Sequence, residues 1–271
     1  QNITPSGLDE CLIQSIELSP HHKGTAYVAA TRYKFNDFSS LSYKTTDYGK
    51  TWVKINHGIS EDDFIKVIRE DKKVKGLLYA GTERGFYISF DGGTVWNKFQ
   101  LNLPVVPVTD IAFADNDMVV STAGRSFWIL DDLSPVQQSL GKLSTLKIYE
   151  PKPTYKFEGY TPSWMDIPPG TGQNPETGVI LDYYLPVAAD SFEVKLQIVD
   201  SQGNVIRNYS SKKNADFKSF PGGPPAPKVI PAAKGLNRFA WDFKSETLPE
   251  IPNAFVYGDY TGYKLAPGKY K

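Results

Sequence analysis

The hydrophobic positions in the first half of the chain form short alternating runs that recur along the sequence. Two of these runs align with each other, G-T-A-Y-V-A-A-T-R at positions 24–32 and G-L-L-Y-A-G-T-E-R at positions 76–84. Each follows a further alternating stretch, and a third, partial copy runs from Val108 to Leu133. Runs with a period of two, bounded by turn residues, predict antiparallel β-strands.

A polar motif with the pattern [ST]-x-D-x-G-x-x-W follows the first two copies. Its marked residues are Thr45, Asp47, Gly49 and Trp52 in the first copy, and Ser89, Asp91, Gly93 and Trp96 in the second. Equivalent positions lie 44 residues apart, a period that suits one four-stranded blade of a β-propeller. The third copy lacks the motif after Ile129, so we predict a partial propeller of two full blades and one degenerate blade.

Three blades are too few to close a ring. Known propellers use roughly four to eight blades, and a repeat unit cannot bury its hydrophobic faces alone. We therefore expect residues 1–148 to be the C-terminal blades of a propeller that continues in a longer protein. The last six residues, A-P-G-K-Y-K, begin like a strand and then stop, which favours truncation at that end too.

The second half of the chain carries no copy of the repeat. A connector rich in proline and glycine covers residues 149–178, and strand-like runs lie at 178–186, on both sides of a turn at 201–203, and at 235–243. Alternation before that turn places Val194, Leu196 and Ile198 on one face. We expect residues 179–271 to form an immunoglobulin- or fibronectin-like β-sandwich, which makes the whole chain all-β.

Composition narrows the classes of partner. Thirty basic and thirty acidic side chains leave no net charge, which disfavours nucleic acid and anionic membrane surfaces as partners. No apolar run approaches the roughly 20 residues that a membrane helix needs. With one cysteine, Cys11, and three histidines outside any metal-ligand spacing, we expect no metal site and no cofactor.

The two polar motifs resemble the Asp-box, or BNR repeat, of sialidase-like and sortilin-like propellers. Longer stretches around them, at 76–93, 101–111 and 124–135, resemble the closing blades of large bacterial proteins of the sortilin/VPS10-like or "BNR-repeat glycosyl hydrolase" group. The runs at 235–243 and 266–270 resemble the C-terminal sandwich of the same group. The resemblance implies a propeller and a secreted, periplasmic or cell-surface location. It implies no single activity, because families with this repeat include hydrolases, receptors and proteins of no known activity.

The motif aspartates Asp47 and Asp91 have two interpretations. They are either catalytic carboxylates or braces that close a tight turn between the outer strands of each blade. A turn brace needs an acceptor for backbone N–H groups and a glycine that tolerates positive φ, and the motif supplies both. Catalysis needs one constellation, whereas every blade needs a brace, so the repetition favours the structural interpretation.

Ligand contacts are expected instead at the mouth of the propeller, just after the repeated strands. Arg32, Glu83, Arg84 and Arg125 occupy these positions. They are candidates for a shared binding face that varies from blade to blade. The alternative is that they are solvated charges or form salt bridges between blades.

Glu83 has a second interpretation, because it follows L-Y-A-G-T and some xyloglucanase-like propellers carry a catalytic carboxylate shortly after such a run. Glycoside hydrolysis usually needs two carboxylates, and Asp110 is a candidate partner unless that partner lies on further blades. The three arginines and nucleophilic tyrosine of a sialidase are not recognisable in this sequence.

Other marked residues have modest interpretations. The pair Asp131 and Asp132 suggests a cap or turn more than a calcium site, which needs six to eight oxygen ligands. Trp164 lies among prolines and is a candidate platform for a sugar ring. Together these observations predict a binding scaffold that recognises a glycan or peptide at a propeller mouth; the alternative is a glycoside hydrolase whose active site needs further blades.

Overall fold

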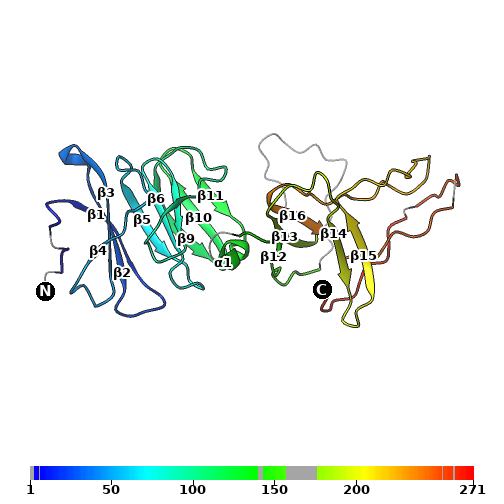
Figure 1. The fold of residues 1–271 in the computed structure, drawn as a ribbon, viewed down its shortest axis with the longest axis horizontal. Coiled ribbons are helices and arrows are strands. Elements are labelled where there is room, and N and C mark those ends of the chain that lie inside the picture. The colour runs from blue at the N-terminus through cyan, green and yellow to red at the C-terminus, as the bar shows by residue number, and fades with distance from the viewer. Residues whose placement is uncertain (1–2, 6, 140–142, 157–175, 252, 259) are drawn as a thin grey trace. The chain divides into compact units, whose positions relative to one another are not determined.

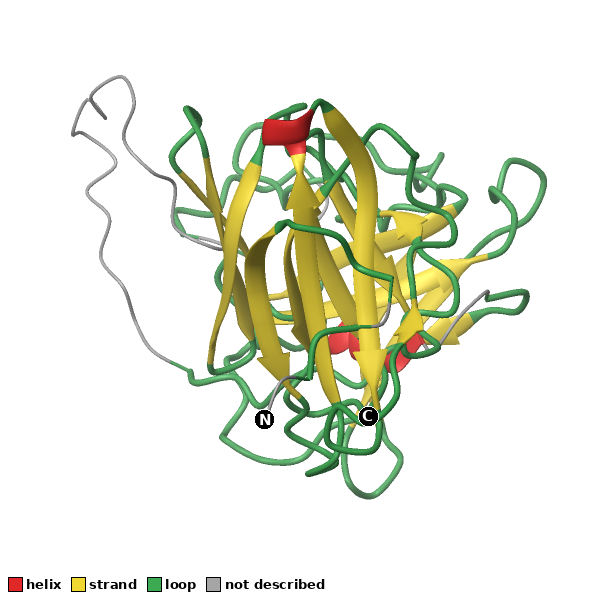
Figure 2. Ribbon diagram, turned by 90° about the vertical axis from the view of Figure 1, so that its left-hand side faces the viewer, coloured by secondary structure: helices red, strands yellow, loops and turns green. Residues whose placement is uncertain are grey.

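Strands make up nearly all of the regular structure of this protein, so the all-β prediction is confirmed (Figure 2). The computed structural model describes residues 3–5, 7–139, 143–156, 176–251, 253–258 and 260–271. The chain divides into two units, residues 1–141 and 142–271. Among the described residues, no helix has the length and hydropathy to cross a bilayer.

The first unit opens with two four-stranded antiparallel sheets in sequential strand order (Figure 1). The first sheet contains β1 (Leu12–Leu18), β2 (Ala26–Arg32), β3 (Asp37–Thr45) and β4 (Val53–Lys54), with a 3-10 turn, η1 (Tyr33–Phe35), between β2 and β3. The second sheet contains β5 (Ile65–Glu70), β6 (Leu78–Thr82), β7 (Phe86–Ser89) and β8 (Asn97–Lys98). The aligned runs of the sequence therefore form β2 and β6, the second strand of each sheet.

A third sheet has three strands in the described residues, β9 (Val108–Ala114), β10 (Asp117–Thr122) and β11 (Phe127–Leu130), followed by the short helix α1 (Ser134–Ser139). The first strands of the three sheets are neighbours, β1 beside β5 and β5 beside β9. Sheets of sequential strands, packed with their first strands adjacent, are the arrangement of consecutive propeller blades.

Alternation along each strand sends side chains into two cores. Ile65 and Ile68 of β5 are fully buried against the first sheet, together with Tyr27 and Ala29 of β2. Val67, between them in sequence, packs in the core shared with the third sheet. The second sheet is thus covered on both faces, which explains the nearly continuous apolar run of β6.

The polar motif forms the turn between the third and fourth strands of the first two sheets. In the first turn, the Asp47 carboxylate accepts hydrogen bonds from the backbone N–H of Thr51 (2.9 Å) and from its hydroxyl (2.7 Å). Thr45 Oγ1 accepts the N–H of Gly49 at 2.9 Å, and Gly49 has a φ of +82°. The hydrogen bonds to the Asp47 carboxylate, led by those from Thr51, lower the pKa of this carboxyl to about 2.

The second turn repeats the contacts of the first. Asp91 accepts the N–H of Val95 at 2.9 Å, and Ser89 Oγ accepts the N–H of Gly93 at 2.9 Å. Trp96 then enters the core between the first two sheets, where its Nε1 donates to Ile55 O at 2.6 Å. The motif therefore joins one sheet to the previous one as well as closing its own turn.

The second unit contains a three-stranded antiparallel sheet and a separate hairpin. The sheet has the order β12 (Lys147–Ile148), β13 (Val179–Leu185), β16 (Gly235–Trp241), and the hairpin pairs β14 (Lys195–Val199) with β15 (Val205–Ser210). Leu181, Ile198, Tyr209 and Trp241 share the core of this unit. The predicted hairpin turn is held by Asp200, whose Oδ1 accepts the N–H groups of Gln202 and Asn204, each at 2.8 Å.

Candidate functional site

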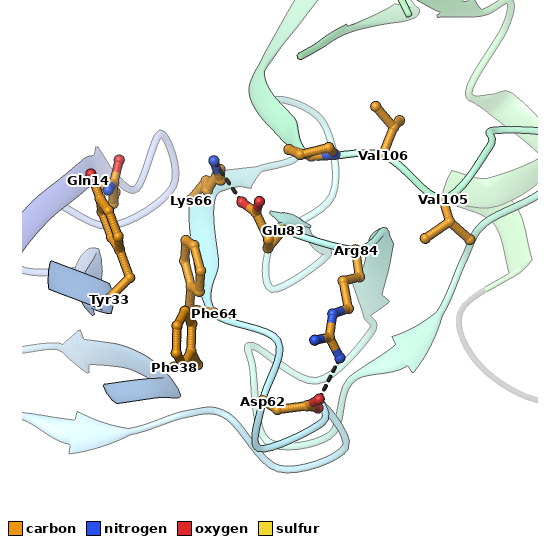
Figure 3. A pocket seen from close by; sticks show the side chains of 11 residues that line it. Gln14, Tyr33, Phe38, Asp62, Phe64, Lys66, Glu83, Arg84, Val105 and Val106 are labelled. Carbon is orange, nitrogen blue, oxygen red and sulfur yellow. Dashed lines mark hydrogen bonds and ion pairs between the residues drawn. The ribbon is translucent and has the colours of Figure 1, made fainter. Parts of the chain in front are cut away.

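A pocket of about 710 Å³ lies in the first unit, at the end of the sheets where β2 and β6 finish and β5 begins (Figure 3). Three chemically different surfaces line it. One wall is aromatic, the opposite wall is aliphatic, and charged side chains lie between them. This volume falls in the range of ordinary ligand pockets.

The aromatic wall consists of Tyr33, Phe38 and Phe64. The ring of Phe64 is buried and stacks on Tyr33, with centroids 5.7 Å apart and an interplanar angle of 13°. Phe38 lies against the same ring at 6.4 Å, and the exposed fractions of Tyr33 and Phe38 are 40% and 46%. The wall therefore offers two accessible rings that a buried third ring holds in place.

Local backbone geometry explains how Tyr33 and Phe38 come together. Asn36 adopts a left-handed conformation with a φ of 60°, and its N–H donates to Tyr33 O at 3.0 Å. Asparagine tolerates this conformation better than most residues, and it reverses the chain directly after η1. The reversal brings β3 back beside β2 and sets Phe38 on the same side as Tyr33.

The charged centre of the pocket is an ion pair between Lys66 and Glu83. Lys66 Nζ lies 2.8 Å from Glu83 Oε2 and 5.5 Å from the centroid of the Phe64 ring. The pairing of β5 with β6 shifts register between Ile65 and Val67. A bulge of this kind re-aims a side chain at the edge of a sheet, and here it turns Lys66 out of the core toward Glu83.

A second ion pair, Arg84 with Asp62, lies at the rim of the pocket. Asp63, the next residue, is buried and accepts three hydrogen bonds. The donors are Arg84 N (2.9 Å), Thr82 Oγ1 (2.9 Å) and Tyr87 OH (3.2 Å). Burial raises the pKa of the Tyr87 phenol, and the Asp63 charge raises it further. Asp63 thus holds in place the turn between β6 and β7, which carries Glu83 and Arg84.

The aliphatic wall is the segment Val105–Pro107, which leads into β9. The side chain of Gln100 anchors the preceding loop. Its Nε2 donates to Leu103 O and Pro104 O, each at 2.9 Å, and its Oε1 accepts the N–H of Phe86 at 3.2 Å. The pocket is therefore assembled from segments of all three sheets of the first unit.

The sequence-based ligand candidates fall into different places. Glu83 and Arg84 line the pocket. Arg32 does not; it pairs with Asp9 at 3.0 Å and with Asp37 at 3.7 Å within its own sheet. Arg125, in the turn between β10 and β11, donates to Gly124 O at 2.9 Å. Trp164 lies outside the described residues.

Asp110, the candidate partner of Glu83 in catalysis, does not line the pocket either. Its Oδ1 lies 2.6 Å from Arg69 Nη2, and the same guanidinium approaches Glu17 at 3.6 Å. Burial raises the pKa of Glu17, and Arg69 partly offsets this rise. Glu83 and Asp110 are therefore held by different cations, Lys66 and Arg69, three positions apart on β5.

The remaining candidates take part in local structure. Asp132 Oδ1 accepts the N–H and the hydroxyl of Ser134, at 3.1 Å and 2.6 Å, at the start of α1. The described residues include no group of three or more His, Cys, Asp or Glu side chains placed to hold a metal ion. Cys11 is half-buried, and this burial raises the pKa of its thiol.

Sequence reasoning missed most of the pocket. The missed lining residues include Tyr33, Phe38, Asp62, Phe64 and Lys66. Asp63, which anchors the loop behind the pocket, was missed as well. One signal was available. Asp9 precedes β1 and Asp62 precedes β5, and each pairs with an arginine at the end of the second strand of its sheet, Arg32 or Arg84. An alignment of the two repeats that extends to Asp9 and Asp62 shows that the first two sheets share this aspartate–arginine ion pair.

Comparisons with known proteins give weak likenesses. No protein-family model matches the chain, and no curated protein sequence matches it. A GH74 enzyme from Niastella koreensis aligns with 44% of this chain and 21% of its own, at 16% identity and a TM-score of 0.37. The GH74 xyloglucanase from Xanthomonas campestris aligns with 70% of this chain and 33% of its own, at 13% identity and a TM-score of 0.34.

A third likeness is to YCF48 bound to D1 peptide, which aligns with 45% of this chain and 37% of its own, at 14% identity and a TM-score of 0.34. The chain thus spans about a fifth to somewhat over a third of the length of these structures. All three TM-scores lie below 0.5, so the likenesses do not by themselves decide the fold or the function.

Proposed function

We propose that this protein is a binding scaffold and that the pocket of the first unit takes a saccharide. The observation that carries the proposal is the pair of accessible rings, Tyr33 and Phe38, beside side chains that hydrogen-bond in both directions. The face of an aromatic ring carries partial negative charge and attracts C–H groups. A sugar ring presents C–H groups on its faces and hydroxyls around its edge, which matches the two kinds of wall.

A peptide is the second ligand class that such a pocket admits. The saccharide is favoured because the two exposed rings lie beside paired charges. Peptide anchors of high affinity usually fill desolvated pockets, whereas Tyr33 and Phe38 remain accessible and form a platform.

The test is a binding assay with a saccharide panel, using isothermal titration calorimetry or a printed array. Tyr33→Ala with Phe38→Ala is expected to abolish binding, while Tyr257→Ala, which removes a fully exposed ring of the second unit, leaves binding unchanged. Equal loss in both variants, or saccharide binding that survives the double change, contradicts this assignment.

A glycoside hydrolase is the alternative function, and the observation that favours it is the position of Glu83 inside the pocket with a second carboxylate, Asp62, at the rim. The reaction needs one protonated acid as well as an ionised partner. Both pocket carboxylates contact cations instead, Lys66 and Arg84, which supports binding over turnover. Release of reducing sugar by a longer form of the protein, lost in Glu83→Gln, establishes the hydrolase.

We also propose that the three sheets of the first unit are blades of a propeller that further blades complete. The face of the first sheet that points away from the second sheet, here named the front face, supports this. One row of paired residues across it is Ile16, Val28, Tyr43 and Lys54, and the matching row of the second sheet is Ile68, Ala80, Tyr87 and Lys98.

Each row begins with an isoleucine, and these two isoleucines differ in burial. Ile68 is 0% exposed because the first sheet covers it, while Ile16 is 63% exposed. A front face that repeats the packing residues of the second sheet is suited to a further sheet of the same kind. The partners of this chain are therefore a saccharide and the remaining blades.

A saccharide-binding propeller of this kind is expected outside the cytoplasm, so we propose that the protein is secreted, periplasmic or displayed on the cell surface. Long polysaccharides are encountered there in their polymeric form. Cell fractionation with an antibody to the chain tests the location, and recovery with cytosolic markers contradicts it.

A further inference from the structure

The charges that line the pocket cancel in two local pairs. Lys66 is paired with Glu83, and Arg84 is paired with Asp62. Among the residues that the structure describes along this lining, these four carry the formal charges. An incoming anion therefore meets no surplus of positive charge, and it meets a carboxylate beside each cation.

The two oxygens of the Glu83 carboxylate have different surroundings. Oε2 is closed to solvent, and Lys66 Nζ contacts it at 2.8 Å. The side chain as a whole is about one-third exposed, with a relative accessibility of 36%. A ligand therefore meets Glu83 through Oε1, while Oε2 remains with the lysine.

A hydroxyl and a carboxylate on the ligand interact differently with this pair. A hydroxyl both donates and accepts, so it can donate to Glu83 Oε1 and accept from Lys66 without separating them. A carboxylate only accepts. It competes with Glu83 for Lys66. If the ligand carboxylate displaces Glu83, the solvent-inaccessible Oε2 of Glu83 stays charged and loses its cation, and an unpaired buried charge is energetically costly.

We propose that the pocket selects uncharged saccharide units and rejects uronic and sialic acids, with Glu83 as the residue that determines this specificity. The inference rests on the proposed saccharide-binding function and adds the chemical class of the ligand. Like charges brought together at an interface suppress the wrong partner more than they strengthen the right one. Glu83 thus acts against acidic sugars and in favour of hydroxyls at the same position.

The test uses polyuronate oligosaccharides, each paired with its carboxyl-reduced form. The two members of a pair have the same linkage and length and differ in the charged group alone. We expect the wild-type chain to bind the reduced, neutral members and to bind the acidic members at least tenfold more weakly, on the order of one charge-assisted hydrogen bond. Titrations run at low ionic strength, because salt screens exposed charges.

Glu83→Gln provides the decisive comparison. It keeps the size of the side chain and leaves the pocket with one net positive charge, so neutral oligosaccharides should bind about tenfold more weakly and acidic ones more tightly than to wild type. Asp9→Asn is the control: it makes the same change in total charge at the Asp9–Arg32 ion pair of the first sheet, outside the pocket lining. It should alter neither series.

The possible results distinguish failure of the proposed specificity from failure of the proposed saccharide binding. Preference of the wild-type chain for the acidic members, or an equal effect of Glu83→Gln on both members, overturns the inference while the saccharide-binding function stands. Absence of binding to every member of the panel, neutral or acidic, overturns the proposed function and the inference with it.

Discussion

Asp63 connects the stability of the fold with the geometry of the pocket, and we predict that Asp63→Ala destabilises the first unit by about 2–3 kcal/mol. The carboxylate is buried and accepts from Arg84 N, Thr82 Oγ1 and Tyr87 OH. Thr82 keeps a second acceptor, Gly85 O at 3.1 Å. Arg84 N keeps a longer bond to Thr82 Oγ1 at 3.3 Å, so of the three donors Tyr87 OH is the one that loses its acceptor outright. A hydrogen bond to a charged group contributes roughly 1.5–3 kcal/mol.

The loss is smaller than the sum of those bonds, because the variant also removes a charge that is costly to bury. Asp63→Asn keeps one amide oxygen as an acceptor and should lose about half as much stability. Asp62→Ala is the neighbouring control: its ion pair with Arg84 is exposed, so its removal should change stability by less than about 1 kcal/mol.

Urea unfolding followed by tryptophan fluorescence measures the effect as a shift of the midpoint at constant slope. Saccharide affinity should fall in the same variant, because Glu83 and Arg84 lose the anchor of their loop. A destabilisation below about 1 kcal/mol, or one no larger than that of Asp62→Ala, refutes the reasoning that Asp63 organises this loop.

Three further predictions concern the turns and the sheet faces. Trp96→Ala should cost about 3–5 kcal/mol because the ring is buried between two sheets, whereas Trp52→Ala, at the same motif position but partly exposed, should cost clearly less in the same denaturation assay. The pKa of Asp47 falls to about 2 from 3.8 on folding, so the stabilisation from its carboxylate is present above pH 3.8 and is lost as the pH falls toward 2. The melting temperatures of wild type and Asp47→Asn should therefore differ at pH 5 and converge at pH 2. A difference between the two melting temperatures that stays the same at both pH values contradicts this. Ile16→Lys should change the stability of the 271-residue chain by less than about 0.5 kcal/mol, whereas Ile68→Lys should unfold the first unit. In a longer form with further blades, Ile16→Lys should destabilise the protein about as much as Ile68→Lys does. If Ile16→Lys leaves the stability of that longer form unchanged, the proposal that a blade covers the front face is refuted.

Much of the fold could be predicted from the sequence, because the patterns that indicate it involve residues close together along the chain. Alternation with a period of two predicts β2 and β6, and the turn chemistry of the polar motif depends on residues within eight positions of one another. Asp47 and Thr51 meet because the turn itself brings them together. The absence of a fourth strand after β11 in the described residues follows in the same way from the missing motif after Ile129.

Only part of the candidate site could be predicted from the sequence. Glu83 and Arg84 were found because they follow a recognisable strand. The aromatic wall was not found, because Tyr33 and Phe38 look like ordinary apolar residues, and their exposure beside the buried Phe64 depends on how the second sheet packs against the first.

Matched positions in the sequence also have different surroundings in the structure. Arg32 and Arg84 lie at the ends of equivalent strands, and each pairs with the aspartate before the first strand of its sheet. Arg84 lies in the pocket because the Val105–Pro107 segment from the third sheet forms the opposite wall. The sequence by itself determines the strands, the repeat and the braced turns, since these arise from neighbours along the chain. Which of the repeated charges belong to a binding site is decided by the tertiary structure, because the adjacent sheets supply the walls.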